Sequence, residues 1–215
     1  MSQEILDIVR ARAITEALHF TTSNGILGIL NTGALLSHAE LPNEDRLSHI
    51  LQINCKDRSR DKDWHTYVNL SISRINGSFF NISRNKWHPT DDIFWCILSF
   101  CPEIMSHDNV FFTTTNNAYD YAKRIPGHYG LEELFQPTVR IFENKHLYRT
   151  KATPDNFTTC PQAEILYPGR VSLKFLNAIY FNSYDDMHEV EAQIAVCAPN
   201  LLGKFALIVA PSLFT

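Results

Sequence analysis

The chain lacks the features that mark secreted, membrane-spanning or zinc-binding proteins. Its cysteines are odd in number and far apart, at Cys55, Cys96, Cys101, Cys160 and Cys197, so neither a disulfide framework nor paired zinc ligands are indicated. No apolar run approaches the length that crosses a bilayer, and residues 1–18 mix acidic and basic side chains without the apolar stretch of a signal peptide. We therefore expect a soluble, cytoplasmic protein with reduced thiols.

Positive charge is also scarce. The sequence has 19 Lys and Arg against 23 Asp and Glu, a formal net charge of −4, so no overall positive field attracts a polyanion. The glycines form neither GxxxxGK nor GxGxxG, and the histidines show no metal-binding spacing such as His-Glu-x-x-His. Any contact with nucleic acid must be local, and no metal is expected.

The chain does have enough apolar surface for one sizeable core. It has 215 residues, of which 45% are hydrophobic, so we expect a single domain over residues 1–215. The patterns predict helices at 3–13, 23–33, 116–124 and 184–198, and a chain break at Pro126, Gly127 and Gly130. They predict strands at 17–21, 65–72, 78–82, 93–100, 109–113, 163–167, 175–181 and, buried, 204–210, and a polar surface loop at 39–63. The expected fold class is α+β, with short and mainly antiparallel strands.

Three segments carry residues suited to chemistry. His19-Phe20-Thr21 ends a strand just before a helix N-terminus capped at Ser23-Asn24, which fits either an amide, ribose or phosphate ligand or ordinary helix-start chemistry. The strand at 65–74 puts Arg74 at the end of an apolar face, where it either reaches solvent or binds an anion. Glu164 stands near the start of a strand, so it lies either at an exposed edge or in a lined cleft.

The order of these segments resembles the DarT family of DNA ADP-ribosyltransferase toxins. The resemblance extends over residues 14–182. Its motifs are His19-Phe20-Thr21, the helix ending at Gly33-Ala34-Leu35-Leu36, the strand ending in Arg74, the stretch Phe111–Ala118, and Gln162-Ala163-Glu164. It implies an ADP-ribosyltransferase fold in which the co-substrate NAD lies in a cleft between two small, mainly antiparallel sheets.

The resemblance also implies roles for single residues. Glu164 corresponds to the catalytic glutamate, and Arg74 to the family's arginine, which we assign to catalysis and to NAD binding. His19, Phe20, Thr21 and Gly28 are expected to bind NAD, and residues 151–162 to shape the acceptor site. Candidate groups for contact with DNA are the aromatics Trp64, Tyr67, Phe79, Phe80 and Trp87 and the cations Arg84, Lys86 and Lys151.

One departure from the family concerns the acceptor base. Thymidine-modifying members have a Pro- and aromatic-rich stretch before the arginine, whereas this chain has Tyr67–Ser73, followed by Arg74-Ile75-Asn76. It is more similar to the second branch, which is associated with guanine. The resemblance further implies a toxin that modifies single-stranded DNA and a macrodomain antitoxin that removes the modification.

Two other functions stay open on the sequence alone. The same NAD cleft serves equally for an enzyme whose acceptor is a protein, an RNA or a small molecule. A catalytically silent nucleic-acid-binding domain would retain the fold without the transfer.

Overall fold

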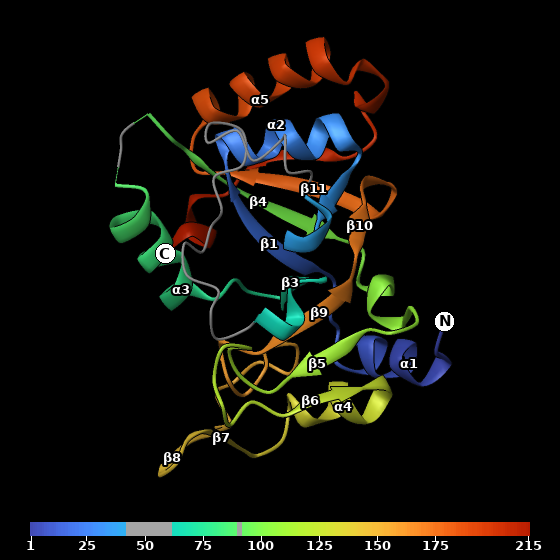
Figure 1. Cartoon of the computed structure of the whole chain (residues 1–215), viewed down its shortest axis with the longest axis vertical. Helices are drawn as coiled ribbons and strands as arrows, with labels where there is room; N and C mark the ends of the chain where they lie inside the picture. Colours follow the sequence, from blue (N-terminus) through green and yellow to red (C-terminus); the bar gives the residue numbers. More distant parts are fainter. Residues whose placement is uncertain (42–61, 90–91) are drawn as a thin grey trace.

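The computed structural model describes residues 1–41, 62–89 and 92–215 (Figure 1). The predicted loop at 39–63 falls mostly outside the described residues. The α-helices are α1 (Gln3–Ala11), α2 (Ser23–Thr32), α3 (Gly77–Ile82), α4 (Gly127–Glu133) and α5 (Tyr184–Cys197). The strands are β1 (Ala17–Thr22), β2 (Ala34–Leu36), β3 (Tyr67–Ile72), β4 (Trp95–Phe100), β5 (Phe111–Thr113), β6 (Arg124–Pro126), β7 (Thr138–Phe142), β8 (Lys145–Tyr148), β9 (Glu164–Pro168), β10 (Arg170–Ser172), β11 (Leu176–Phe181) and β12 (Ala206–Val209).

The expected α+β class is confirmed, but the arrangement of the sheets differs from the prediction. Instead of two small sheets, the described strands form one eight-stranded sheet in the order β12-β11-β4-β1-β3-β9-β5-β6, with two-stranded sheets β10-β2 and β7-β8 beside it. The pairing is antiparallel except between β11 and β12. The two expected sheets are continuous because β1 pairs with β3 as well as with β4.

β1 and β3 pair over only two residues, and the candidate site lies where this pairing ends. All six residues of β1 pair with β4, whereas the register with β3 contains only Ala17↔Ile72 and Leu18↔Ser71. Beyond Leu18 the two strands no longer pair. We call β12-β11-β4-β1 the first half of the sheet and β3-β9-β5-β6 the second half.

Helices cover both faces of the first half. α2 and α5 pack against each other and against β1, β4, β11 and β12 on one face (Figure 1). On the other face, Phe80 of α3 and Phe214 of the C-terminal turn join a buried cluster with Leu18, Phe20 and Trp95. α1 and α4 pack together beside β5 and β6 at the far end of the second half. No helix among the described residues is long and apolar enough to span a membrane.

Several local predictions are wrong. The predicted strand at 78–82 is helix α3, because the Asn76 side chain accepts a hydrogen bond from the Phe79 N–H and starts a helix there. The predicted helix at 116–124 is a series of turns that ends in β6, and the predicted break at Gly127 and Gly130 is helix α4. α2 is capped by Thr22 and not by Ser23 or Asn24.

The hydrophobic pattern of the sequence also gave wrong predictions for β12 and for the hairpin β7-β8. β12 is half-exposed and not buried, because it pairs with β11 alone at the edge of the sheet. The hairpin β7-β8 was not predicted. β7 alternates exposed and buried positions over only five residues, and β8 has no buried residue, so the period-2 signal of a strand is weak here.

Candidate active site

Glu164 is the first residue of β9 and lies inside the sheet. β9 pairs with β3 on one side and with β5 on the other, where Glu164 is opposite Thr113. Only 7% of the residue is exposed. The alternative of an exposed edge carboxylate is therefore wrong, and a buried acid must be held by donors.

Donors from two different elements hold the Glu164 carboxylate. Its Oε2 accepts a hydrogen bond from the Asn69 side-chain amide at 3.1 Å and another from the Asn117 backbone N–H at 2.8 Å. Asn69 is opposite Leu166 in the register of β3 with β9, so its side chain is the diagonal neighbour of Glu164 on the same face. The two contacts come from different elements and fix the orientation of the carboxylate.

The Asn117 donor is itself positioned by Arg124. The Arg124 guanidinium donates to the Asn117 side-chain oxygen at 2.6 Å, and also to the backbone oxygens of Asn117, Tyr119 and Ala122. It thereby holds the turn at residues 116–122 in the shape that aims the Asn117 N–H at Glu164. Sequence reasoning did not assign a role to Asn69, Asn117 or Arg124, although Asn69 stood on the polar face of a predicted strand and Asn117 stood inside a family motif.

His19 joins the same group from the first half of the sheet. Its Nδ1 lies 2.9 Å from the backbone oxygen of Asn69, across the gap where β1 and β3 no longer pair. Because a carbonyl oxygen only accepts, this Nδ1 carries the proton, and a neutral ring then has its lone pair on Nε2. Asn69 thus links His19 and Glu164, two residues that are 145 positions apart (164 − 19).

Thr21 is held close to the start of α2. It is buried, and a Cβ added to Gly25 would lie 2.2 Å from the Thr21 hydroxyl oxygen. Any side chain at Gly25 would therefore displace Thr21. The next residue, Thr22, accepts a hydrogen bond from the Gly25 N–H at 3.1 Å. The expected strand-to-helix junction is present, with glycine needed for the close approach.

Phe20 and Gly28, the other two predicted NAD-binding residues, have different surroundings from His19 and Thr21. Phe20 is buried in the cluster on the opposite face, with its ring 5.3 Å from Phe80 and 5.7 Å from Trp95. A contact between NAD and Phe20 would therefore come from the backbone. Gly28 is half-buried within α2, and its carbonyl accepts a hydrogen bond from the Thr32 hydroxyl at 2.9 Å.

Arg74 contacts the segment that precedes Glu164. Its guanidinium lies over the Phe157 ring at 4.7 Å and donates to the Thr158 backbone oxygen at 3.4 Å. Partial burial lowers the pKa of the guanidinium, yet an arginine remains a cation at neutral pH and a poor base. Its buried Nε has no hydrogen-bond partner in the described part of the chain. Arg74 therefore attaches the end of β3 to the predicted acceptor segment.

The candidate DNA contacts separate into buried and accessible groups. Phe80 is fully buried, whereas Trp64 and Tyr67 are half-buried and form an aromatic cluster with Phe111. The Arg124 guanidinium lies 5.8 Å from the Trp64 ring. Phe79 and Trp87 pack edge to face, and Arg84, Lys86 and Lys151 are exposed. Within the described ranges, no three His, Cys, Asp or Glu side chains are grouped as a metal site requires.

Solved structures that share this fold include DarT proteins from two organisms. DarT of Thermus sp. 2.9 in complex with carba-NAD+ has a TM-score of 0.64 at 14% identity, with 94% of this chain and 98% of that chain covered. The same protein in complex with ADP-ribosylated ssDNA gives 0.63 at 16% identity, with 94% and 97% covered. Thermosipho africanus DarTG in complex with ADP-ribose gives 0.56 at 18% identity, with 93% and 51% covered. At these low sequence identities, the structural likeness establishes a shared fold and nothing more.

The sequence comparison identifies the family. No curated protein matches the chain. The family model described as "DarT: ssDNA thymidine ADP-ribosyltransferase, DarT" matches residues 18–212, which is most of the chain. The predicted enzyme class, an NAD-dependent DNA ADP-ribosyltransferase, and the predicted co-substrate NAD are thereby confirmed. The chain belongs to the DarT family of single-stranded-DNA ADP-ribosyltransferases.

Proposed function

We propose that this enzyme transfers ADP-ribose from NAD to guanine in single-stranded DNA, with Glu164 as its catalytic carboxylate. The observation that carries the proposal is the group formed by Glu164, Asn69 and His19: the buried carboxylate accepts hydrogen bonds from Asn69 and Asn117, and Asn69 also contacts the His19 imidazole. This group lies at the place where the two halves of the sheet no longer pair.

The reaction breaks one glycosidic bond and forms another. The bond between C1′ of the ribose and the nicotinamide nitrogen breaks, and its electron pair leaves with neutral nicotinamide. Positive charge develops on the ribose ring, as in glycoside hydrolysis. The guanine amino nitrogen then bonds to C1′ and releases a proton to the Glu164 carboxylate, from which it passes to water. A fixed carboxylate beside the ribose stabilises the charged transition state.

The remaining predicted residues bind and position. His19 and Thr21, with the backbone of Phe20 and with Gly28, hold the nicotinamide half of NAD at the start of α2. Arg74 holds the segment at residues 157–158 in place. It also provides a cation for an NAD phosphate or the acceptor strand.

Guanine is favoured by the segment that departs from the thymidine-type pattern. That segment forms β3, and it provides Asn69, whose amide contacts the catalytic carboxylate. The guanine amino group is a nucleophile that thymine lacks. Thymidine is the second candidate, because the description of the matching family names it.

Oligonucleotides of equal length that each lack one base test the acceptor. We expect transfer of label from NAD to every single strand that contains guanine, and mass spectrometry of the nucleosides should show ADP-ribosyl-guanosine. Duplex DNA should react poorly, because exposing a paired base costs a few kcal/mol. If guanine-free strands are modified and thymine-free strands are not, the acceptor is thymidine. Label on protein, RNA or a small molecule offered in the same tube would replace DNA as the acceptor, and no NAD binding or hydrolysis would indicate a silent binding domain.

The biological setting proposed for this enzyme follows its family resemblance. Residues 1–215 act as one ADP-ribosyltransferase domain in the cytoplasm, as the toxin of a toxin-antitoxin pair. The partner is a macrodomain that removes ADP-ribose from DNA. Expression of the chain with and without such a macrodomain, with cell growth and DNA modification as readouts, tests both statements.

A further inference from the structure

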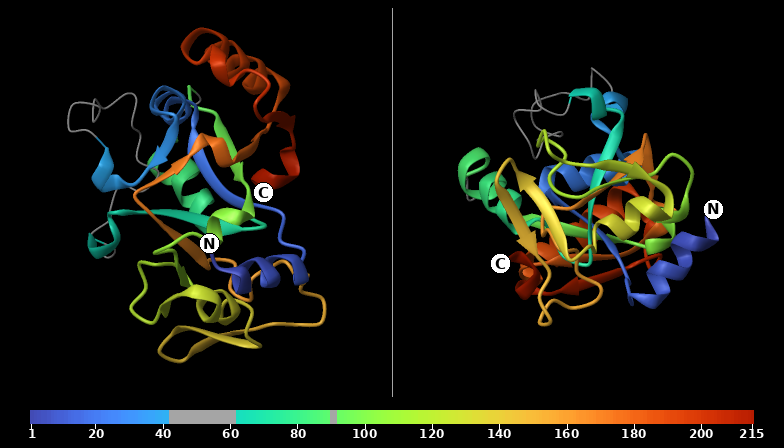
Figure 2. Two further views of the ribbon diagram at one scale, coloured as in Figure 1. Left: turned by 90° about the vertical axis from the view of Figure 1, so that its right-hand side faces the viewer. Right: turned by 90° about the horizontal axis from the view of Figure 1, so that it is seen from below.

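The turn at residues 116–122 lies between β5 and β6 and provides the Asn117 N–H that donates to Glu164 at 2.8 Å. β5, β6 and α4 lie toward the end of the molecule opposite α5, as Figure 1 and the left view of Figure 2 show. Two cations, Lys123 and Arg124, follow the turn directly. Side chains of adjacent residues in an extended segment point to opposite faces, so these two cations serve different sides of the sheet.

Arg124 lies on the same face of the sheet as Glu164. It is opposite Thr113 in the register of β6 with β5, and Thr113 is opposite Glu164 in the register of β5 with β9. Residues opposite one another in neighbouring strands share a face. The Cα atoms of Arg124 and Glu164 are therefore two strand spacings apart, roughly 10 Å. One strand separates the guanidinium from the catalytic carboxylate.

The Arg124 guanidinium directs its hydrogen bonds at the turn. Its acceptors are the Asn117 side-chain oxygen at 2.6 Å, the backbone oxygens of Ala122 at 3.0 Å and Tyr119 at 3.3 Å, and the Asn117 backbone oxygen. The Trp64 ring lies 5.8 Å from the same group. None of these acceptors is a carboxylate. Because a guanidinium is a rigid fork of donors, these contacts fix the shape of the turn.

Asn117 depends on Arg124 for its orientation. The residue is buried, and in the described part of the chain its side-chain oxygen accepts only from Arg124, while its Nδ2 has no partner. The backbone oxygens of Asn117 and Ala122 also accept only from Arg124 among the described residues. Without the guanidinium, three acceptors would lose their donor, and the turn would rearrange to satisfy them. The Asn117 N–H would then move relative to Glu164.

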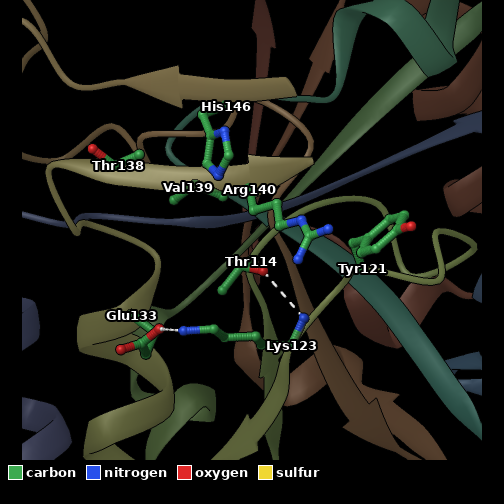
Figure 3. A pocket seen from close by; sticks show the side chains of 8 residues that line it. All are labelled: Thr114, Tyr121, Lys123, Glu133, Thr138, Val139, Arg140 and His146. Carbon is green, nitrogen blue, oxygen red and sulfur yellow. Dashed lines mark hydrogen bonds and ion pairs between the residues drawn. The ribbon is translucent and has the colours of Figure 1, made fainter. Parts of the chain in front are cut away.

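Lys123 serves the other face. Its ammonium pairs with Glu133 of α4 at 2.8 Å and lines a pocket of about 380 Å³ on the α4 side of the sheet (Figure 3). The second dashed line in Figure 3 joins the Lys123 backbone N–H to the Thr114 hydroxyl at 3.2 Å, so this contact does not need the lysine side chain. Neither interaction involves Asn117 or Glu164. Lys123 is therefore a matched control for Arg124.

We infer that Arg124 is a positioning residue for the transfer step, which holds the Asn117 N–H against the Glu164 carboxylate. The inference rests on the proposed function, since it takes Glu164 as the catalytic carboxylate. That carboxylate must lie beside the ribose C1′ when the bond to nicotinamide breaks, and a displacement of about 1 Å can lower a rate by about 10²-fold. Arg124 thus contributes to the rate of transfer and not to the binding of NAD or DNA.

The test compares Arg124→Gln, Arg124→Lys and Lys123→Gln with the unaltered protein. The rate comes from single-turnover transfer from NAD to a fluorescein-labelled single-stranded oligonucleotide with all four bases. Nicotinamide release is followed in parallel, so that the comparison does not depend on which base is modified. Calorimetry gives the Kd for NAD, and fluorescence anisotropy gives the Kd for the oligonucleotide.

For Arg124→Gln we expect a rate lower by about tenfold to hundredfold, with both Kd values unchanged. Arg124→Lys should recover part of the rate, because it keeps the charge but loses the planar fork of donors. Lys123→Gln removes the adjacent charge on the opposite face and should match the unaltered protein in rate and in both Kd values.

Two double-mutant cycles show whether Arg124 acts through Asn117 on Glu164. Asn117→Ala keeps the backbone N–H but loses the side-chain contact with Arg124, so it should slow transfer less than Arg124→Gln does. Added to Arg124→Gln, it should have no further effect. Arg124→Gln should likewise add nothing to Glu164→Gln, as expected for residues that act as one unit. If circular dichroism shows that Arg124→Gln does not fold, Arg124→Lys takes its place in both cycles.

The outcomes separate this inference from the proposed function. If Glu164→Gln is slow and a folded Arg124→Gln transfers at the original rate, the positioning role is refuted while the proposed function stands. The positioning role is also refuted if Arg124→Gln raises KM or Kd at an unchanged kcat, or if its effect persists undiminished in Glu164→Gln. Transfer at the original rate in Glu164→Gln would refute both.

Discussion

Glu16 and Glu164 lie beside different halves of the sheet and both accept hydrogen bonds through Oε2, but different groups provide the donors. Glu16, just before β1, accepts from the hydroxyls of Ser99 at 2.7 Å and Tyr180 at 3.0 Å. Glu164 accepts from the Asn69 amide and from a backbone N–H in a turn. The donors of Glu16 stand on the fully paired strands β4 and β11 of the first half, whereas Glu164 lies by the gap between the halves.

The difference separates a structural carboxylate from a catalytic one. Glu16 ties three neighbouring elements of the helix-covered half, and burial together with the Glu16 charge raises the pKa of Tyr180. Glu164 is linked to His19 through Asn69 and is oriented by a turn that Arg124 holds. Stability should therefore depend on the first carboxylate and transfer on the second.

Glu164→Gln should have the largest effect. The amide keeps the size of the side chain and an oxygen for the Asn117 N–H, so the fold should persist. It removes the negative charge that stabilises the ribose cation, and we expect transfer to fall by about 10²–10³-fold or more. Single-turnover transfer to an oligonucleotide measures the rate, and calorimetry with NAD checks binding. Transfer at the unaltered rate in a folded variant would exclude Glu164 from the mechanism.

Glu16→Gln should reverse the pattern. Two hydrogen bonds to a charged group become bonds to a neutral one, so we expect a loss of about 1–3 kcal/mol in the free energy of unfolding. The folded fraction should still transfer ADP-ribose at the original rate. Urea unfolding followed by circular dichroism gives the stability. A variant that keeps its stability but loses transfer would contradict the division between the two carboxylates.

The sequence predicted those parts of the site that lie within single segments of regular secondary structure. The strand that ends at His19-Phe20-Thr21, the helix after it and the strand that begins at Glu164 all have clear periodic patterns, and the structure contains them. The family resemblance singled out the same residues. Local pattern was sufficient here because each segment buries one face against the common core.

The contacts between segments were not predictable in this way. Asn69 and Arg124 act through partners 95 and 7 positions away, and the second of these lies in a stretch that looked helical. The single sheet depends on two residue pairs between β1 and β3, which no periodic pattern indicates. Tertiary pairing decided these features, and it overrode the preference for a helix start at Asn116.

The smallest effect on function should come from His19→Ala and Thr21→Ala. Both residues belong to the first half of the sheet, and the two variants test whether that half also binds NAD. His19 contacts Asn69 across the gap, and Thr21 is packed against Gly25 at the start of α2. If both side chains bind the nicotinamide half of NAD, each substitution should weaken NAD binding by about threefold to tenfold, which corresponds to the loss of roughly one hydrogen bond. Calorimetric titration with NAD measures this, and Thr215→Ala is the matched control, because it removes a hydroxyl that donates only to the Ser212 backbone oxygen in the C-terminal turn. Unchanged affinity in both variants would return this segment to ordinary helix-start chemistry and leave NAD binding to other elements.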